Sequence, residues 1–148
     1  MTNQHITKLL ELSHLSAVAE IERLTFIEPW SQKSLELLTR DGNLGVAAFE
    51  GETPVAYVGL IVCAPEGEIT NVATHPDFRR KGYGEAVLKR LEEEARKRGV
   101  ETLYLEVRSS NLAAQTLYLK LGYEKTGERK GFYKNPKEDA VLMSRALK

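Results

Sequence analysis

A short basic loop in the middle of the chain carries the residue types that bind phosphate. Residues 72–84 read VATHPDFRRKGYG, and the loop follows an apolar strand and opens a long helix, whose N-terminus favours anions. Three cations lie in it: Arg79, Arg80 and Lys81. Gly82 and Gly84 have no Cβ, so a phosphate could approach the main chain closely. Taken alone, the loop is explained as well by a solvated basic turn at a helix start.

A carboxylate on a later strand is the candidate general base. Residues 103–107 alternate, so that Glu106 shares one face with Tyr104 and Arg108 while the apolar residues share the other. In a sheet covered on both sides, an unpaired acid is costly to bury. Partial burial would raise the pKa of Glu106 toward neutrality, which suits proton abstraction. A salt bridge between Glu106 and an arginine at the sheet edge is the alternative.

Two sequence blocks in order resemble a known family. The pattern Arg79-x-x-Gly82-x-Gly84 resembles the acetyl-CoA signature of the GNAT superfamily. Residues 105–123, LEVRSSNLAAQTLYLKLGY, are similar to the second half of the protein N-terminal acetyltransferases of the RimI type, which modify a ribosomal-protein alanine. Further segments fit the same pattern: 28–31 (EPWS), 132–133 (FY) and 138–140 (EDA). The resemblance covers almost the whole chain, strongly from about residue 68 to 145.

The resemblance implies a binding site for acetyl-CoA as co-substrate. Its residues would be Val72, Ala73, Thr74, Arg79, Arg80, Lys81, Gly82, Tyr83, Gly84, Glu85, Asn111 and Tyr118. The main chain of 72–74 would bind the pantetheine arm, and main-chain N–H groups of 80–85 the pyrophosphate. Asn111 and Tyr118 lie seven apart, two turns along one helix face. The alternative makes Asn111 an N-cap and Tyr118 a core aromatic.

The resemblance also implies the reaction. Glu106 would accept the proton of the attacking amine, Tyr118 would act as general acid toward coenzyme A, and Glu28, Trp30 and Tyr133 would line the peptide pocket. The acceptor would be a protein N-terminus, in particular the alanine of a ribosomal protein, attacking directly in a ternary complex. An α-amine, with a pKa of about 7.7–8.0 against about 10.4 for lysine, is the easier nucleophile at neutral pH.

Two other functions remain open from the sequence. A GNAT protein could acetylate a small-molecule amine or a lysine side chain, or it could be a non-catalytic acetyl-CoA-binding regulatory module. Phe132 stands where other family members have a first hairpin tyrosine, so one hydroxyl for the peptide backbone is missing. The presence of both Glu106 and Tyr118 argues against the non-catalytic regulatory module.

Composition argues against several other classes of protein. The chain has 148 residues with 21 Lys plus Arg and 21 Asp plus Glu, so no basic field favours nucleic acid. No apolar run approaches the roughly 20 residues of a membrane span, and residues 1–5 lack the features of a signal peptide. Cys63 is expected to be a buried, inert thiol, and His5, His14 and His75 have no metal-ligand spacing. We therefore expect a cytoplasmic enzyme without a metal, a monomer or weak homodimer.

The elements that position these residues follow from periodicity and turn signals. Residues 6–10 are predicted to be a short strand or a connector. Strands are predicted at 44–50, 54–62, 68–74, 103–107, 123–133 and 139–147, and helices at 15–26, 31–40, 83–98 and 111–121. Ser13 and Ser31 are candidate N-caps. This order predicts one α/β domain over 1–148 with helices on both faces of a mixed sheet. The resemblance specifies the GNAT acyl-CoA N-acyltransferase fold, with a mostly antiparallel sheet of six to seven strands.

Overall fold

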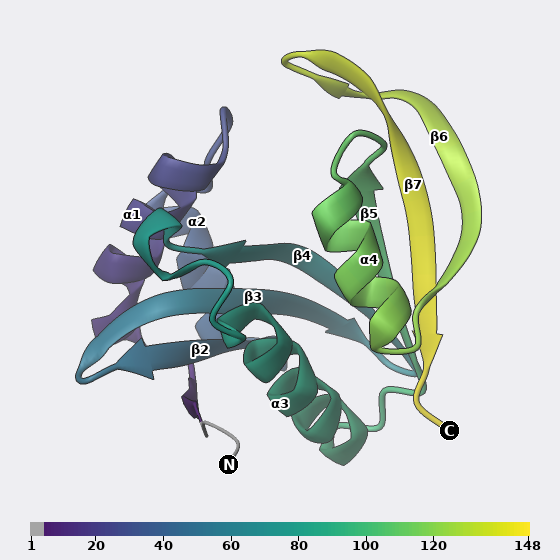
Figure 1. The fold of residues 1–148 in the computed structure, drawn as a ribbon. Coiled ribbons are helices and arrows are strands. Elements are labelled where there is room, and N and C mark those ends of the chain that lie inside the picture. The colour runs from purple at the N-terminus through teal and green to yellow at the C-terminus, as the bar shows by residue number, and fades with distance from the viewer. Residues whose placement is uncertain (1–4) are drawn as a thin grey trace.

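Seven strands form one continuous sheet in the computed structural model, which describes residues 5–148. The strands are β1 (Ile6–Leu9), β2 (Leu44–Glu50), β3 (Thr53–Cys63), β4 (Glu66–Thr74), β5 (Thr102–Arg108), β6 (Glu124–Lys134) and β7 (Lys137–Ala146). Their order across the sheet is β1-β2-β3-β4-β5-β7-β6, and only β4 and β5 run parallel (Figure 1). The predicted mixed, mostly antiparallel sheet is confirmed.

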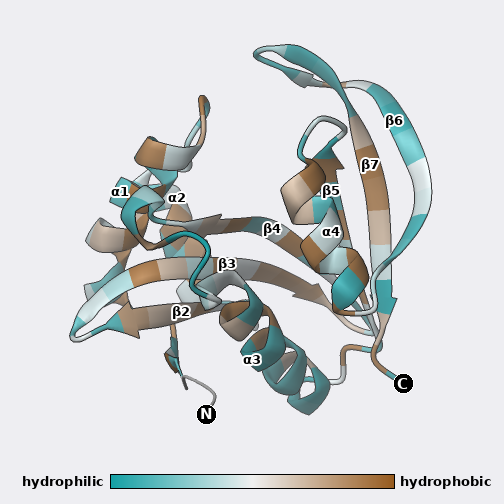
Figure 2. Cartoon of the chain, viewed as in Figure 1, coloured by the Kyte–Doolittle hydropathy of each residue, from teal (hydrophilic) through white to brown (hydrophobic). Residues whose placement is uncertain are grey.

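Helices cover both faces of this sheet, as predicted. The α-helices are α1 (Leu15–Thr25), α2 (Gln32–Leu35), α3 (Tyr83–Lys97) and α4 (Leu112–Lys120), and the 3-10 turns are η1 (Leu12–His14), η2 (Glu36–Thr39) and η3 (Pro76–Phe78). Helices α1 and α2 share a buried cluster with one face of β2–β4, while α3 and α4 share the larger cluster with the other face. Figure 2 shows the outward side of α3 as hydrophilic, in keeping with its amphipathic sequence.

The sheet opens between β4 and β5. These strands pair only from Glu66–Glu68 to Thr102–Tyr104, after which they diverge (Figure 1). Further along, β4 keeps its partner β3, with Val58 opposite Val72 and Leu60 opposite Ile69. Two β4 residues, Thr70 and Asn71, therefore face the single residue Gly59, which is a β-bulge. One edge of β4 beyond the bulge consequently faces the opening rather than another strand.

Element boundaries follow local sequence signals with few exceptions. Ser31 caps α2 by accepting a hydrogen bond from Ser34 N at 3.1 Å, as predicted. Ser13 does not cap α1, because it lies inside the preceding 3-10 turn and His14 occupies the N-cap. Strand β4 begins at Glu66, two residues before the predicted start. Residues 1–4, part of the segment used to argue against a signal peptide, lie outside the described residues.

Within residues 5–148, no helix combines the length and the apolar character needed to cross a membrane.

Candidate active site

The start of α3 presents main-chain N–H groups without helical partners. Gly82 is the N-cap, in a left-handed conformation (φ 83°), and provides no side-chain cap. The first bond of the helix runs from Ala86 N to Gly82 O at 3.1 Å. The N–H groups of Tyr83, Gly84 and Glu85 therefore have no acceptor within the helix. Such a helix start is suited to an anion.

The three loop cations are all exposed, and two of them also contact the protein. Arg79 Nε donates to Thr74 O at 3.3 Å, which ties the loop to the end of β4. The Lys81 ammonium lies 5.5 Å from the centre of the Phe78 ring. Arg80 has a positive φ of 64°, which a non-glycine residue adopts only at some cost. The loop thus holds its positive charge at the surface beside the helix start.

Tyr83 and Glu85 use their side chains for structure. The Tyr83 hydroxyl donates to Glu50 Oε2 at 2.6 Å, and its buried ring stacks on His5 with a centroid distance of 4.2 Å. Glu85 accepts from Lys120 Nζ at 2.7 Å, which links α3 to α4, and pairs with Lys89 at 2.9 Å. These contacts, Lys120 first, lower the pKa of the Glu85 carboxyl. Only the main chain of these two residues is available to a ligand.

Gly82 and Gly84 differ in whether the fold itself requires a glycine. At Gly82, an added Cβ would come within 3.0 Å of His5 Nε2, and the backbone is left-handed. Gly82 is therefore explained by its conformation and by the close approach of His5, without invoking phosphate. At Gly84, a Cβ would meet Leu117 at 3.5 Å and Thr74 Oγ1 at 3.8 Å, which are ordinary contacts. The fold itself tolerates a side chain at Gly84.

Val72, Ala73 and Thr74 form the part of β4 that borders the opening. In the register with β3 they lie opposite Val58, Tyr57 and Ala56. Pairing with β5 ends at Glu68, so within the described chain no strand occupies their other edge. A free extended edge can hydrogen-bond an extended partner.

Glu106 lies on β5 beside this opening and is half-buried. Burial raises the pKa of its carboxyl above the usual value, the charge of Glu68 raises it further, and the Arg129 guanidinium opposes both. Its face of the sheet is less covered than predicted: Tyr104 is 38% exposed, because α1 and α2 pack over β2–β4 rather than over β5. Among residues 5–148 Glu106 forms no ion pair, so the alternative of a structural salt bridge is wrong.

Tyr118 lies on α4 and Asn111 caps the start of this helix; Tyr118 packs with the apolar residues of β5, on the opposite face from Glu106. Tyr118 is 6% exposed and packs on Tyr123 with a centroid distance of 5.6 Å. Burial, and then Tyr133, raise the pKa of Tyr118 well above its usual value, so the phenol keeps its proton. Asn111 Oδ1 accepts from Ala114 N at 3.1 Å, so the N-cap interpretation is correct and only its amide N–H groups remain for a ligand.

Tyr133, on β6, interacts electrostatically both with Glu106 and with Tyr118, which lie on opposite faces of β5. Its pKa is raised by burial and then by the charge of Glu106, and it in turn raises the pKa of Tyr118, so Tyr133 lies within electrostatic range of each of these two side chains. The Arg108 guanidinium lies 4.3 Å from the centre of the Tyr133 ring. Arg108 also donates to Asn135 O and Pro136 O, both at 3.0 Å, which fixes the tip of the β6–β7 hairpin on the end of β5.

The hairpin tip reaches the loop between α1 and α2. Asn135 Nδ2 donates to the exposed Glu28 Oε1 over a long distance of 3.4 Å, across 107 residues of sequence. Trp30, on the same loop, is half-buried, and its main-chain N–H donates to Glu22 at 2.8 Å. Glu28 and Tyr133 thus both lie at the hairpin that contacts the end of β5, while Trp30 borders a hollow shared with Ser34 and Leu37.

Sequence reasoning missed Glu22, Arg108 and Asn135. Glu22 had a detectable signal, because it lies four residues after Val18 on the stripe of α1 that periodicity assigns to the core. Arg108 and Asn135 act on residues far away in sequence, and no local pattern marks them.

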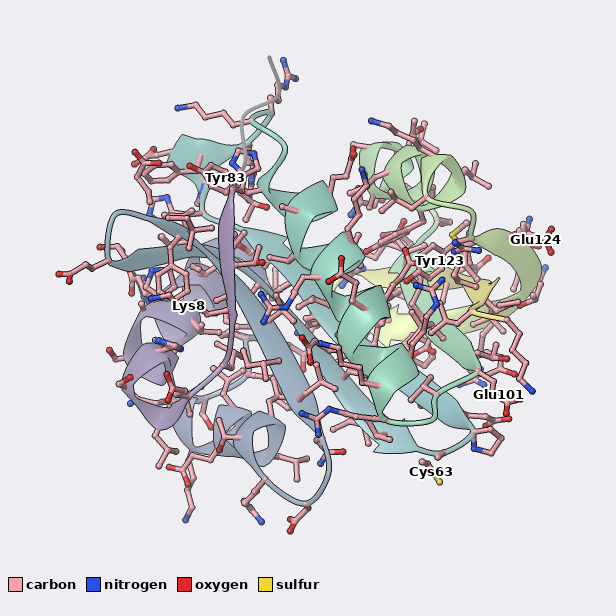
Figure 3. All side chains as sticks on the ribbon, turned by 90° about the horizontal axis from the view of Figure 1, so that it is seen from below. Lys8, Cys63, Tyr83, Glu101, Tyr123 and Glu124 are labelled. Carbon is pink, nitrogen blue, oxygen red and sulfur yellow. The ribbon has the colours of Figure 1, made fainter. Side chains whose placement is uncertain are left out.

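Cys63 corrects another expectation. It is exposed at the end of β3 rather than buried, and Figure 3 places it at the opposite end of the molecule from Tyr83 at the start of α3. Among residues 5–148 no cluster of three or more His, Cys, Asp or Glu side chains has the arrangement of a metal site.

Known proteins are similar to this chain in both sequence and fold. The sequence model of the acetyltransferase (GNAT) family matches residues 15–123. The chain is 36% identical over 137 residues to the ribosomal protein bS18-alanine N-acetyltransferase of Escherichia coli K12, covering 91% of this chain and 93% of that protein. The crystal structure of the ribosomal-protein-S18-alanine N-acetyltransferase from Escherichia coli superposes with a TM-score of 0.89 at 34% identity, covering 97% of this chain and 94% of that one. The yncA protein of Salmonella typhimurium, solved with its cofactor acetyl-CoA, shares the fold with a TM-score of 0.80 at 21% identity, covering 99% and 95%. With its split sheet and its glycine-containing helix start, this chain belongs to the GNAT family of acetyltransferases.

Proposed function

We propose that this acetyltransferase transfers the acetyl group of acetyl-CoA to the α-amino group of the N-terminal alanine of a ribosomal protein. The main support for this proposal is that relatives with this activity match the chain over nearly its full length, at 36% identity for the Escherichia coli enzyme. The match to the family model, residues 15–123, includes the opening of the sheet together with Glu106 and Tyr118.

The residues at the opening fit the two ends of acetyl-CoA. The unpaired N–H groups of 83–85, flanked by the exposed cations Arg79, Arg80 and Lys81, are suited to the pyrophosphate. The free edge formed by Val72, Ala73 and Thr74 is suited to the amides of the pantetheine arm, and the amide N–H of Asn111 is a further donor. When bound, acetyl-CoA supplies the thioester carbonyl as acyl donor.

Glu106 acts on the proton of the substrate amine, and Tyr118 acts on the departing sulfur of coenzyme A. Glu106, with its pKa raised by burial, accepts a proton from the ammonium group of the substrate, directly or through a water. Tyr118 holds its proton on Oη at neutral pH and can donate a hydrogen bond to the departing sulfur. Glu28, Trp30 and Tyr133 orient the peptide, and holding two reactants in one geometry supplies much of the acceleration.

An assay of coenzyme A release tests this function. The protein is mixed with acetyl-CoA and a peptide that begins with alanine, and release is compared with that for a polyamine and for an N-blocked peptide containing lysine. We expect release with the free α-amine alone, because roughly one α-amine in ten is neutral at pH 7 against about one lysine in 2,500. Equal or greater turnover with the polyamine or lysine peptide would refute the assignment. A cofactor that binds without turnover on any of these amines would indicate a regulatory module.

A further inference from the structure

Among residues 5–148 one acid is completely buried, and the proposed chemistry does not use it. Glu22, in the last turns of α1, has no exposed surface. Its carboxylate accepts three hydrogen bonds: from Trp30 N at 2.8 Å, from Asn71 Nδ2 at 2.9 Å and from the Tyr57 hydroxyl. Burying a carboxylate is costly unless hydrogen-bond donors satisfy it, so the three donors offset the cost of burying Glu22.

The first hydrogen bond controls the acceptor loop, residues 26–31 between α1 and α2. The main-chain oxygen of Glu22 accepts from Phe26 N at 2.9 Å and ends the helix, while its side chain holds Trp30 N. One residue therefore holds the loop at both ends of the segment that contains Glu28. Because Glu28 lies between the two anchors, its position depends on them.

The second hydrogen bond controls the strand that borders the opening. Asn71 occupies the β-bulge of β4, immediately before Val72, Ala73 and Thr74. A bulge leaves its extra residue without a ladder partner, so another contact must fix its conformation. The Asn71 amide is fixed by Glu22, so the direction in which β4 continues along the opening depends on the same carboxylate.

The third hydrogen bond to the Glu22 carboxylate comes from the Tyr57 hydroxyl. Tyr57 is fully buried on β3, opposite Ala73 of β4. Burial, and then the charge of Glu22, raise the pKa of Tyr57, so its hydroxyl remains a donor. Tyr57 belongs to neither the acceptor loop nor the edge of β4 that faces the opening, so it provides a control for the other two contacts.

We propose that Glu22 is a positioning residue that sets the acceptor loop and the cofactor-facing edge of β4 relative to each other. The inference rests on the proposed function, because it assigns the acceptor loop to the peptide and the edge of β4 to acetyl-CoA. Through one carboxylate, the binding of both substrates depends on a residue that touches neither.

Replacement of Glu22 by methionine tests this inference, because methionine keeps the approximate volume but accepts none of the three bonds. We expect Glu22→Met to raise both the KM for an alanine-initiated peptide and the dissociation constant of acetyl-CoA by roughly tenfold or more. Tyr57→Phe is the matched control: it lowers thermal stability but keeps both contacts, so both constants should stay within about twofold of wild type. Glu22→Gln should be intermediate, since an amide oxygen still accepts from Trp30 and a turned Asn71 amide can accept in return.

Fluorescence gives a readout that does not depend on the acceptor. Trp30 is the single tryptophan, so its emission and its quenching by acrylamide report the acceptor loop directly. Glu22→Met should shift the emission to longer wavelength and increase quenching, and Tyr57→Phe should not. If wild type fails to acetylate the peptide, the proposed function fails, while fluorescence and calorimetry with acetyl-CoA still test Glu22.

The inference is overturned if Glu22→Met melts at a lower temperature but keeps wild-type constants and wild-type fluorescence. It is also overturned if only one of the two substrate constants changes. Should Glu22→Met fail to fold, Asn71→Leu replaces it as the test: acetyl-CoA binding should weaken roughly tenfold while Trp30 fluorescence stays unchanged. Unchanged acetyl-CoA binding in Asn71→Leu refutes the contribution of Glu22 to the edge of β4.

Discussion

Alanine at Gly84 distinguishes a glycine that the fold requires from one that the cofactor requires. Gly84 lies in the first turn of α3, and its missing Cβ would point between Leu117 and Thr74 without a clash, at 3.5 and 3.8 Å. Alanine in a helix is more stable than glycine by roughly 0.5–1 kcal/mol. Gly84→Ala should therefore raise the melting temperature, by roughly 2–4 °C per kcal/mol in a domain of this size.

The same substitution, Gly84→Ala, should weaken the binding of acetyl-CoA. In the proposed complex the pyrophosphate lies against the N–H groups at the start of α3, and a methyl group beside Thr74 would occupy that approach. We expect a dissociation constant roughly tenfold or more above that of wild type, measured by isothermal titration calorimetry. A gain in stability together with a loss of affinity cannot arise from a folding defect.

Gly82→Ala is the contrasting variant. Its φ of 83° costs a side chain roughly 1–2 kcal/mol, and the added Cβ would lie 3.0 Å from His5 Nε2. Gly82→Ala should therefore lose stability whether or not a phosphate binds there, and His5→Ala should relieve only the contact part of the loss. If Gly84→Ala binds acetyl-CoA as tightly as wild type, no cofactor group lies against this helix start, and the argument for the phosphate site is refuted.

Three further predictions concern the side chains around the opening. Glu106→Gln should reduce kcat for coenzyme A release by roughly 10²–10⁴-fold with acetyl-CoA affinity unchanged; unchanged turnover would exclude Glu106 as the base. Because the base must be ionised, activity falls as pH drops through the pKa of Glu106, and the acidic limb of kcat/KM should lie above the pH expected for an ordinary glutamate. Glu68→Gln removes a charge that raises the pKa of Glu106, so the acidic limb of the kcat/KM profile should move to lower pH. An unchanged limb would contradict the effect of Glu68 on Glu106. Arg108→Gln frees the hairpin tip and Tyr133, and should raise the peptide KM roughly tenfold with acetyl-CoA binding unchanged; an equal loss of both would indicate a general structural defect.

Several features of the site follow from short stretches of sequence. The loop at 79–84, the alternation that puts Glu106 opposite its apolar neighbours and the cap at Ser31 all depend on residues within one turn or one strand. The N-cap at Asn111 is confirmed, and it leaves the predicted cofactor contact of the Asn111 amide N–H groups open. Periodicity and turn chemistry are local, so a sequence without its structure suffices to locate these elements.

What a side chain meets across the fold was decided only by tertiary structure. Local pattern predicted a buried Cys63 and a fully covered face around Glu106, but strand ends and helix placement leave both more exposed. His5, which precedes β1, contacts Lys81 O beside Gly82 across 76 residues of sequence, and Glu28 contacts Asn135 across 107. Such contacts depend on how separate elements pack, and no periodicity in either segment encodes them. The sequence by itself therefore determined which residues stand on which strand or helix, and the packing of those elements decided which of them meet at the opening of the sheet.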